Sequence, residues 1–270
     1  MKIPRLVTTI FLTMIMGTSA AGLLITPGPA YAKKPVPAPA PVYTWNGFYV
    51  GGNTGYASAS SDPSTTTIFT PADYWDILSV PQVNAAGTGS VSPHGFVGGV
   101  QAGYNWQTGA WVLGTEVDFE SFHLNASRTA GATYLCCAGS FLMTQTTSAD
   151  WLFTARARLG WAADNWLFYG TGGLAVTDLS HQSVFSDTFG AAENVNDSTT
   201  KAGWAAGAGI EYAFLTNWRV RGEFLYVSFG SVTSTSILGP VAIVGCSCTP
   251  MFHSANLNVD IARLGVNYKF

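Results

Sequence analysis

From residue 47 to the last residue, apolar and polar side chains alternate with a period of two. In the segment 152–161 (LFTARARLGW), Phe153, Leu159 and Trp161 fall on one face, while Arg156 and Arg158 fall on the other. Such alternation is typical of β-strands that separate two different environments. The same pattern predicts strands near 47–57, 95–107, 110–123, 150–162, 166–179, 202–214, 217–228 and 256–270.

The connections between these strands alternate in length. Those at 107–110, 163–166 and 214–217 are tight, whereas those at 58–94, 124–149, 180–201 and 229–255 are long. Short turns on one side and long loops on the other are typical of outer-membrane barrels. The pattern therefore predicts an all-β fold, a transmembrane antiparallel up-and-down β-barrel of eight strands with short periplasmic turns and long extracellular loops. The first long connection contains DYWDILSV, which could form another hairpin, so ten strands are the alternative.

The composition agrees with a membrane barrel. Only 10% of the residues are charged and 13% are aromatic, whereas soluble domains average about 25% charged residues. After residue 32 there is no run of the ~20 apolar residues that a transmembrane helix requires. The chain carries no basic patch, so nucleic acid is not an expected partner.

Aromatic residues recur at a spacing that fits a bilayer. Phe96 and Trp106 lie ten residues apart on one face, as do Trp151 and Trp161. Ten residues extend over ~33 Å of strand, which at a tilt of about 40° spans an apolar band ~25 Å tall. The predicted girdle residues are Trp106, Trp111, Trp161, Trp166 and Trp218 beside the short turns, with Trp151 and Trp204 at the other boundary. A soluble β-sandwich would not require this spacing.

If the aromatic faces contact lipid, the opposite faces fill the lumen with charges of both signs. The predicted acidic members are Glu116, Asp118, Glu120, Glu211 and Glu223, and the basic members are Arg156, Arg158, Arg219, Arg221 and Arg263. Five charges of each sign suit a desolvated interior, because an unpaired buried charge is costly. Eight strands leave an interior just wide enough for side chains to fill, which favours a closed lumen over an open pore.

The N-terminus indicates export. Lys2 and Arg5 precede an apolar stretch, and Ala30 and Ala32 form a small-residue cleavage site. We interpret residues 1–32 as a secretory signal peptide, with an uncleaved anchor as the alternative. Residues 33–46 read as a proline-rich periplasmic linker, and residues 47–270 form the predicted outer-membrane barrel.

Four segments carry a resemblance to a known family. The segments TWNGFYVGGNTGYA (44–57), RARLGWAADNWLFYGTGGLA (156–175), GWAAGAGIEYAFLTNWRVRGEFLYVSFG (203–230) and IARLGVNYKF (261–270) resemble the small outer-membrane β-barrel domain family. That family includes opacity-like and outer-membrane immunogenic proteins, often labelled "porin family". The resemblance implies a monomeric barrel in the outer membrane without an enzymatic site. It also implies that the last strand, ending in Phe270, is the signal that the barrel-assembly machinery reads.

The cysteines offer another candidate chemistry. Cys136, Cys137, Cys246 and Cys248 all fall in predicted outer loops, and export permits disulfides. One or two bridges between the second and fourth long loops are expected, with the connectivity open. Bridging between neighbouring cysteines and a metal site made with His253 are the alternatives.

One motif raises an enzymatic alternative. Some eight-stranded barrels are lipid A deacylases with a His-x-Ser pair, and His181 and Ser183 have this spacing, with Glu193 nearby. A base, a nucleophile and a carboxylate are suitable residue types, but a three-residue match has low specificity. Ser121 and His123 have the reverse order.

The sequence thus predicts a structural, surface-exposed barrel that contributes to envelope integrity and presents loops, without enzymatic activity, cofactor or metal. Its expected partners are outer-membrane lipid and lipopolysaccharide. The acidic loops are expected to be solvated, and sharing divalent cations with lipopolysaccharide phosphates is the alternative. A small-solute channel and a lipid A-modifying enzyme are the alternative functions.

Overall fold

The computed structural model describes residues 43–71, 73–238 and 249–270. Within them lie one helix and nine strands, all antiparallel: β1 (Gly47–Ser60), β2 (Ser64–Thr67), α1 (Ser79–Gly87), β3 (His94–Thr108), β4 (Trp111–Thr133), β5 (Ser140–Ala163), β6 (Trp166–Asp187), β7 (Ala192–Ala213), β8 (Trp218–Ile237) and β9 (Pro250–Lys269). The predicted signal peptide and most of the predicted linker lie outside the described residues. No helix of the described residues is long and apolar enough to cross a membrane.

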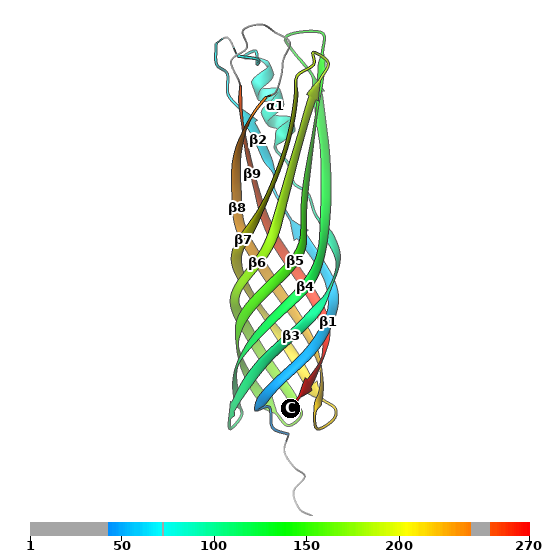
Figure 1. Cartoon of the computed structure of the whole chain (residues 1–270), viewed down its shortest axis with the longest axis vertical. Coiled ribbons are helices and arrows are strands. Elements are labelled where there is room, and N and C mark those ends of the chain that lie inside the picture. Colours follow the sequence, from blue (N-terminus) through cyan, green and yellow to red (C-terminus); the bar gives the residue numbers. More distant parts are fainter. Residues whose placement is uncertain (1–42, 72, 239–248) are drawn as a thin grey trace, which may run out of the picture. The chain divides into compact units, whose positions relative to one another are not determined.

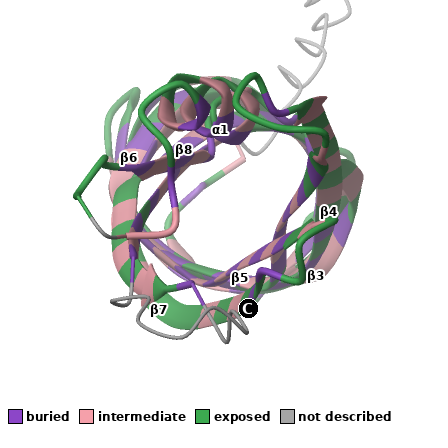
Figure 2. Cartoon of the chain, turned by 90° about the horizontal axis from the view of Figure 1, so that it is seen from above, coloured by how far each residue is buried: buried purple, intermediate pink, exposed green. Residues whose placement is uncertain are grey.

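Eight of the strands close into a ring. Each long strand pairs with the next one along the chain, and β1 pairs with β9 from Tyr49–Lys269 to Ser60–Asn258. Figure 1 shows the strands winding around the barrel, and Figure 2 shows the closed ring from one end. The prediction of an eight-stranded up-and-down barrel is therefore confirmed. A closed ring leaves no unpaired strand edge inside a bilayer.

The short turns lie at the end of the barrel where the C-terminus is marked in Figure 1, here called the turn end. Gly109 (φ 60°) and Asp164 (φ 51°) both adopt the left-handed backbone conformation that such tight connections require. Trp45, which belongs to the predicted linker 33–46, is fully buried at this end with Val112, Leu167 and Tyr169. The last residues of that segment thus pack against the barrel.

Three of the four predicted long loops were largely wrong, because the strands continue through them. The segments 124–133 and 140–149 pair along β4 and β5, 180–187 pairs with 192–198 along β6 and β7, and 231–237 pairs with 250–256 along β8 and β9. These residues are polar on the outside because that face meets water, so the apolar alternation that marks the membrane part is lost. We call these paired segments beyond the membrane part the outer extension. It begins at the register shifts at Ser121/Leu124, Ser148/Leu152 and Ser228/Ser231.

The first long connection adds neither a hairpin nor two further strands, so the ten-stranded alternative was wrong. Above Ser60, β2 takes the place of β1 beside β9. Because β3 begins at His94, the outer part of β4 pairs with β5 on one side and has no strand neighbour on the other. Helix α1 contacts both β2 and β4 across this opening. Figures 1 and 2 show α1 at the outer end, next to the ring.

Side chains of the helix region bind the backbone of both exposed edges. Asn84 accepts a hydrogen bond from the Thr67 amide (2.7 Å) and donates to the Thr67 carbonyl (3.2 Å). On the other side, Gln82 donates to the Thr133 carbonyl (2.8 Å), and Arg128 of β4 donates to the Ala86 carbonyl (2.8 Å). Covering a strand edge in this way satisfies backbone groups that would otherwise be free to pair with another chain.

The outer face of the membrane part carries the predicted aromatic residues. Trp106, Trp111, Trp161, Trp166 and Trp218 are all exposed near the short turns. Trp218 packs on Tyr268, which packs in turn on Phe270. At the other boundary, Trp151 stacks on Phe119 and Trp204 packs on Tyr226. The two groups of aromatic residues flank an exposed apolar face, as in barrels embedded in a bilayer.

Candidate functional site: the charged layer of the lumen

The inward side chains form successive layers along the barrel. Beginning at the turn end, the first is the aromatic plug around Trp45. Next comes the charged layer, defined here as the five acidic and five arginine side chains listed above. An apolar layer follows, which includes Phe122, Leu152 and Ile261. In the outer extension a polar layer around His253 is followed by a second apolar layer around Trp75.

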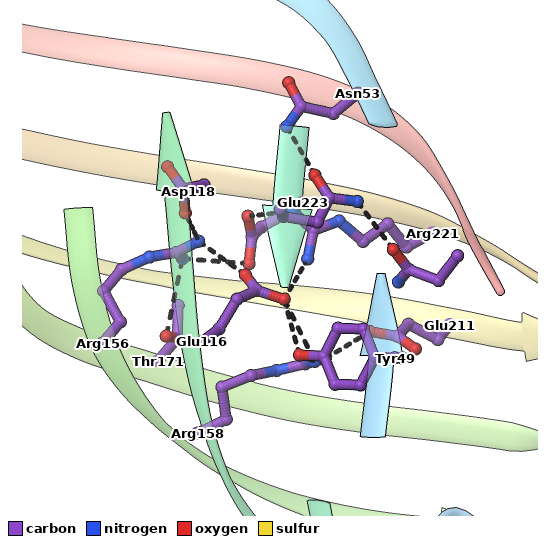
Figure 3. Close-up of polar contacts among 12 residues, drawn as sticks. Tyr49, Asn53, Glu116, Asp118, Arg156, Arg158, Thr171, Glu211, Arg221 and Glu223 are labelled. Atoms are coloured by element: carbon purple, nitrogen blue, oxygen red, sulfur yellow. Dashed lines mark hydrogen bonds and ion pairs between the residues drawn. The ribbon is translucent and has the colours of Figure 1, made fainter. Parts of the chain in front are cut away.

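All ten members of the charged layer lie together, and all are buried. They reach the lumen because β4, β5, β7, β8 and β9 each present every second residue inward. The predicted antiparallel pairing of the third and fourth long strands is confirmed, with Glu116 opposite Arg156. Figure 3 shows several members of the layer, among them Glu116, Arg156 and Arg221, converging from different strands.

Glu116 is the central acceptor of the charged layer. Its carboxylate accepts hydrogen bonds from Arg156 (2.7 Å), Arg221 (2.6 Å) and Arg158 (3.3 Å). The Tyr49 hydroxyl donates a further hydrogen bond of 2.7 Å. The dashed lines in Figure 3 meet at this carboxylate. Three guanidinium groups thus surround one fully buried carboxylate and compensate its charge.

Arg156 and Arg263 connect the other carboxylates. Arg156 pairs with Asp118 at 2.6 Å and with Glu223 at 3.1 Å. Arg263 pairs with Glu223 at 2.5 Å, with Asp118 at 3.4 Å and also with Glu120. Because each guanidinium bridges several carboxylates from different strands, the charged layer ties opposite walls of the barrel together.

Arg219 differs from the other arginines. Its one ion pair is to Glu211 at 3.4 Å, and its three guanidinium nitrogens have no hydrogen-bond partner among the described residues. Its charge instead lies over the rings of Tyr49 (4.5 Å) and Trp45 (5.4 Å). Cation–π contact therefore replaces much of the hydrogen bonding.

Sequence reasoning missed three uncharged members of this region. Tyr49 donates to Glu116, Tyr169 donates to Glu223 (3.0 Å), and Thr154 donates to Asp118 (2.8 Å). The period of two already places Tyr49 on the inward face of its strand with Gly51, so the alternation alone could have identified Tyr49 as a lumen residue. Nothing in the sequence indicates which carboxylate each hydroxyl would meet.

Inward glycines make room for these side chains. A Cβ atom on Gly103 would lie 2.4 Å from the Tyr49 hydroxyl oxygen, and one on Gly209 would lie 2.4 Å from that of Tyr169. On Gly173 the Cβ would lie 2.1 Å from the Ala155 carbonyl. The two tyrosine rings therefore occupy space that any other residue at Gly103 or Gly209 would fill.

The polar layer in the outer extension holds the motif behind the enzymatic alternative. His181 and Ser183 both point into the lumen and are buried. Glu193 does not join them: it accepts a hydrogen bond from Ser236 and lies 3.1 Å from Nε2 of His253. The other ring nitrogen of His253 hydrogen-bonds Thr65 at 2.9 Å. Glu193 thus binds Ser236 and His253, and the Ser183 hydroxyl and Nε2 of His181 have no hydrogen-bond partner among the described residues.

The described cysteines bond to each other. Cys136 and Cys137 form a vicinal disulfide, whereas Cys246 and Cys248 lie outside the described residues. This pairing is the local alternative named above. The expected bridge to the fourth long loop would need Cys246 or Cys248 and stays a prediction. Among the described residues, no group of three or more His, Cys, Asp or Glu side chains is arranged to hold a metal ion.

A closed antiparallel barrel with aromatic girdles outside and an ion-pair layer inside defines the class of bacterial outer-membrane β-barrel proteins. The chain belongs to the outer membrane protein beta-barrel domain family, whose model matches residues 18–270. It is a protein of the cell outer membrane.

Its relatives include immunogenic surface proteins. The chain is 35% identical over 240 residues to the 31 kDa outer-membrane immunogenic protein of Brucella melitensis, with 88% of this chain and 89% of the relative covered. It is 25% identical over 241 residues to the 25 kDa outer-membrane immunogenic protein of Brucella abortus, covering 88% and 86%. The outer membrane protease OmpT of Escherichia coli matches 83% of this chain and 97% of its own, with 7% identity and a TM-score of 0.48. Similarity at that level says nothing about activity.

Proposed function

We propose that the protein is a closed structural barrel that stabilises the outer membrane and holds an outer extension above the cell surface. The observation that carries the proposal is the burial of the charged layer. The side chains of Arg156, Glu116 and Asp118 are 0% exposed, and that of Arg158 is 2% exposed. Charges that line a water path would be hydrated, whereas these are paired with one another.

The layers on either side of the charged layer support the same function. Trp45 lies below it at the turn end, and the apolar layer with Phe122, Leu152 and Ile261 lies above it. An ion that crossed the barrel would have to leave water at both layers, which is costly for a charge. The fold is consistent with a protein that acts through its stability and its surface.

We expect a monomer that contacts lipid and lipopolysaccharide and is inserted by the barrel-assembly machinery, which would read the C-terminal strand ending in Phe270. We also expect no enzymatic activity. The inward orientation of His181 and Ser183 supports this expectation, because lipid A would lie outside the barrel.

Single-channel conductance tests the closed lumen. The mature protein would be refolded, shown to be folded by its faster migration on an unheated gel, and added to a planar bilayer. We expect no discrete current steps, while a general diffusion porin prepared in the same way gives them. Reproducible steps from the folded protein would overturn the proposal and assign transport to the charged layer.

A second experiment tests the role in the envelope. A strain that lacks the protein should become more sensitive to detergent and to large antibiotics that an intact outer membrane excludes. The wild-type chain should restore resistance, and so should Ser183→Ala if no catalysis is involved. Lipid A acylation that changes with Ser183→Ala would contradict the non-enzymatic assignment.

A further inference from the structure

A pocket of about 420 Å³ lies at the outer end of the barrel, far from the charged layer. Its walls come from the segment before α1 (Tyr74, Trp75 and Asp76), from the β4–β5 connection (Tyr134 and the Cys136–Cys137 disulfide) and from the β6–β7 connection (Phe189). Three connections that are distant in the sequence thus contribute to one concave site. Its volume lies within the range of ligand pockets.

The walls of the pocket are mainly aromatic. Tyr74 packs edge-on against Trp75 with ring centroids 4.9 Å apart, and Trp75 lies 6.3 Å from Tyr134. Tyr134 stacks on Phe189 at 6.0 Å. Trp75 and Tyr134 are buried, whereas Phe189 is 47% exposed and forms the rim. A molecule that enters from outside would therefore meet the exposed part of Phe189 and the partly exposed Tyr74, with Trp75 and Tyr134 behind them.

The Phe189 ring is held in position by its neighbours. It lies over Gly139, where a Cβ atom would come within 2.3 Å of the ring. At the disulfide, Ser79 Oγ lies 3.4 Å from Cys136 Sγ. The packing of Phe189 on Tyr134 and over Gly139 orders the rim before any ligand binds, which limits the entropy lost on binding.

The electrostatics of the pocket favour a positive charge. Asp76 is an exposed carboxylate in the lining, and no Lys or Arg is among the described residues that line the pocket. Behind the rings, the hydroxyls of Tyr74 and Tyr134 both donate to the same oxygen of Asp187. Burial, together with the charge of Asp187, raises the pKa of Tyr134, so this hydroxyl remains a donor.

We propose that this pocket binds an alkylammonium cation, such as a free quaternary amine. Ring faces attract such a cation through their quadrupole, and hydroxyl groups bonded to a carboxylate make the rings more electron-rich. The methyl groups suit the apolar walls, while Asp76 neutralises the charge at the rim. A basic residue in the lining would have repelled the same ligand.

Binding of choline to the refolded full-length mature protein tests the proposal. The matched probe is 3,3-dimethylbutan-1-ol, which has the shape of choline but a carbon in place of the charged nitrogen. The protein should be held in a maltoside detergent, because phosphocholine detergents carry the group under test. Isothermal titration should show saturable binding of choline, with a preference over the neutral alcohol of about 5-fold or more.

Two substitutions locate the binding. Phe189→Leu removes the aromatic rim and Asp76→Asn removes the carboxylate, and each should weaken choline binding severalfold. The controls are Phe69→Leu and Asp150→Asn, because both residues are exposed in the outer part of the chain and neither lines the pocket. All four positions are on the surface, so the variants should refold, as gel migration would verify.

The outcomes separate the alternatives. Equal binding of choline and the neutral alcohol would show an apolar pocket without selection for charge and would overturn the proposal. So would undetectable choline binding, or binding that Phe189→Leu and Asp76→Asn leave unchanged. Phosphocholine serves as a third probe: tighter binding of choline supports a free cation, whereas tighter binding of phosphocholine would overturn it in favour of a lipid headgroup.

Discussion

Replacing Arg156 with methionine is the sharpest test of the charged layer. Methionine fills much of the same volume, so the change removes the charge and its hydrogen bonds without opening a large cavity. Three carboxylates lose a partner: Glu116, Asp118 and Glu223. The charged layer then carries four positive charges against five negative ones.

The expected cost follows from what each carboxylate retains. Glu116 keeps Arg158 and Arg221, and Asp118 and Glu223 both keep Arg263. None is left entirely unpaired, yet one negative charge in the layer is uncompensated. Removing one partner of a buried ion pair typically costs 3–5 kcal/mol, so we expect the free energy of unfolding to fall by about 3 kcal/mol or more.

Arg219→Met is the matched control. Arg219 is equally buried in the same layer, but it makes only one ion pair, to Glu211, which keeps Arg158. Its loss removes chiefly the cation–π contacts with Tyr49 and Trp45, so a cost of about 1–2 kcal/mol is expected. The two variants therefore differ in their ion pairs and share the same change in side chain.

The assay is urea unfolding of protein refolded into phospholipid vesicles, followed by tryptophan fluorescence and by gel migration without heating. The double variant Arg156→Met/Asp118→Asn restores four charges of each sign and should be more stable than the sum of the single changes predicts, by about 0.5–3 kcal/mol. Equal stability of Arg156→Met and the wild type would refute the assignment of a paired, desolvated lumen. Equal losses in Arg156→Met and Arg219→Met would show that burial alone, and not pairing, determines the cost.

Two further changes probe the geometry. Gly173→Ala should lower heat stability in detergent because its Cβ would lie 2.1 Å from a backbone carbonyl. Gly170→Ala on the same strand is the control, because the atom nearest to its Cβ would lie 3.9 Å away. Similar melting of the two variants on gels would argue against the inward placement of Gly173. Tryptic mapping of the unreduced protein should find Cys136 and Cys137 oxidised within one peptide. A cross-link from that peptide to the one that contains Cys246 would exclude the vicinal disulfide.

Most of the membrane part was predictable from the sequence because the bilayer imposes a simple rule. Lipid on one side and a packed lumen on the other force apolar and polar side chains to alternate strictly along each strand. The inward orientation of Arg156, Arg158 and Glu116 follows from this alternation. The tight turns and the tryptophans beside them fix the strand ends. The alternation cannot show which carboxylate pairs with which arginine, because that depends on the stagger between strands and on the length of each side chain.

The outer extension was not predictable in the same way. Residues such as Phe141, Met143 and Phe185 face inward there, but Thr and Ser occupy the outward positions because that face meets water. A serine- and threonine-rich segment therefore looks like a loop, although threonine is a good strand former. The packing of α1 between β2 and β4 depends on contacts distant in the sequence, such as that of Gln82 with Thr133, and no local pattern encodes it.

The outer extension also sets the height of the barrel's outer tip above the apolar band. From Ser121 to Thr133, strand β4 rises ~40 Å along its own length beyond the aromatic boundary, or roughly 30 Å above the apolar band at a tilt of about 40°. Deleting residues in pairs from each strand would lower the tip in steps without exchanging its inner and outer faces, because side chains alternate with a period of two. If the tip binds a partner as proposed, that partner would not need to approach the lipid surface.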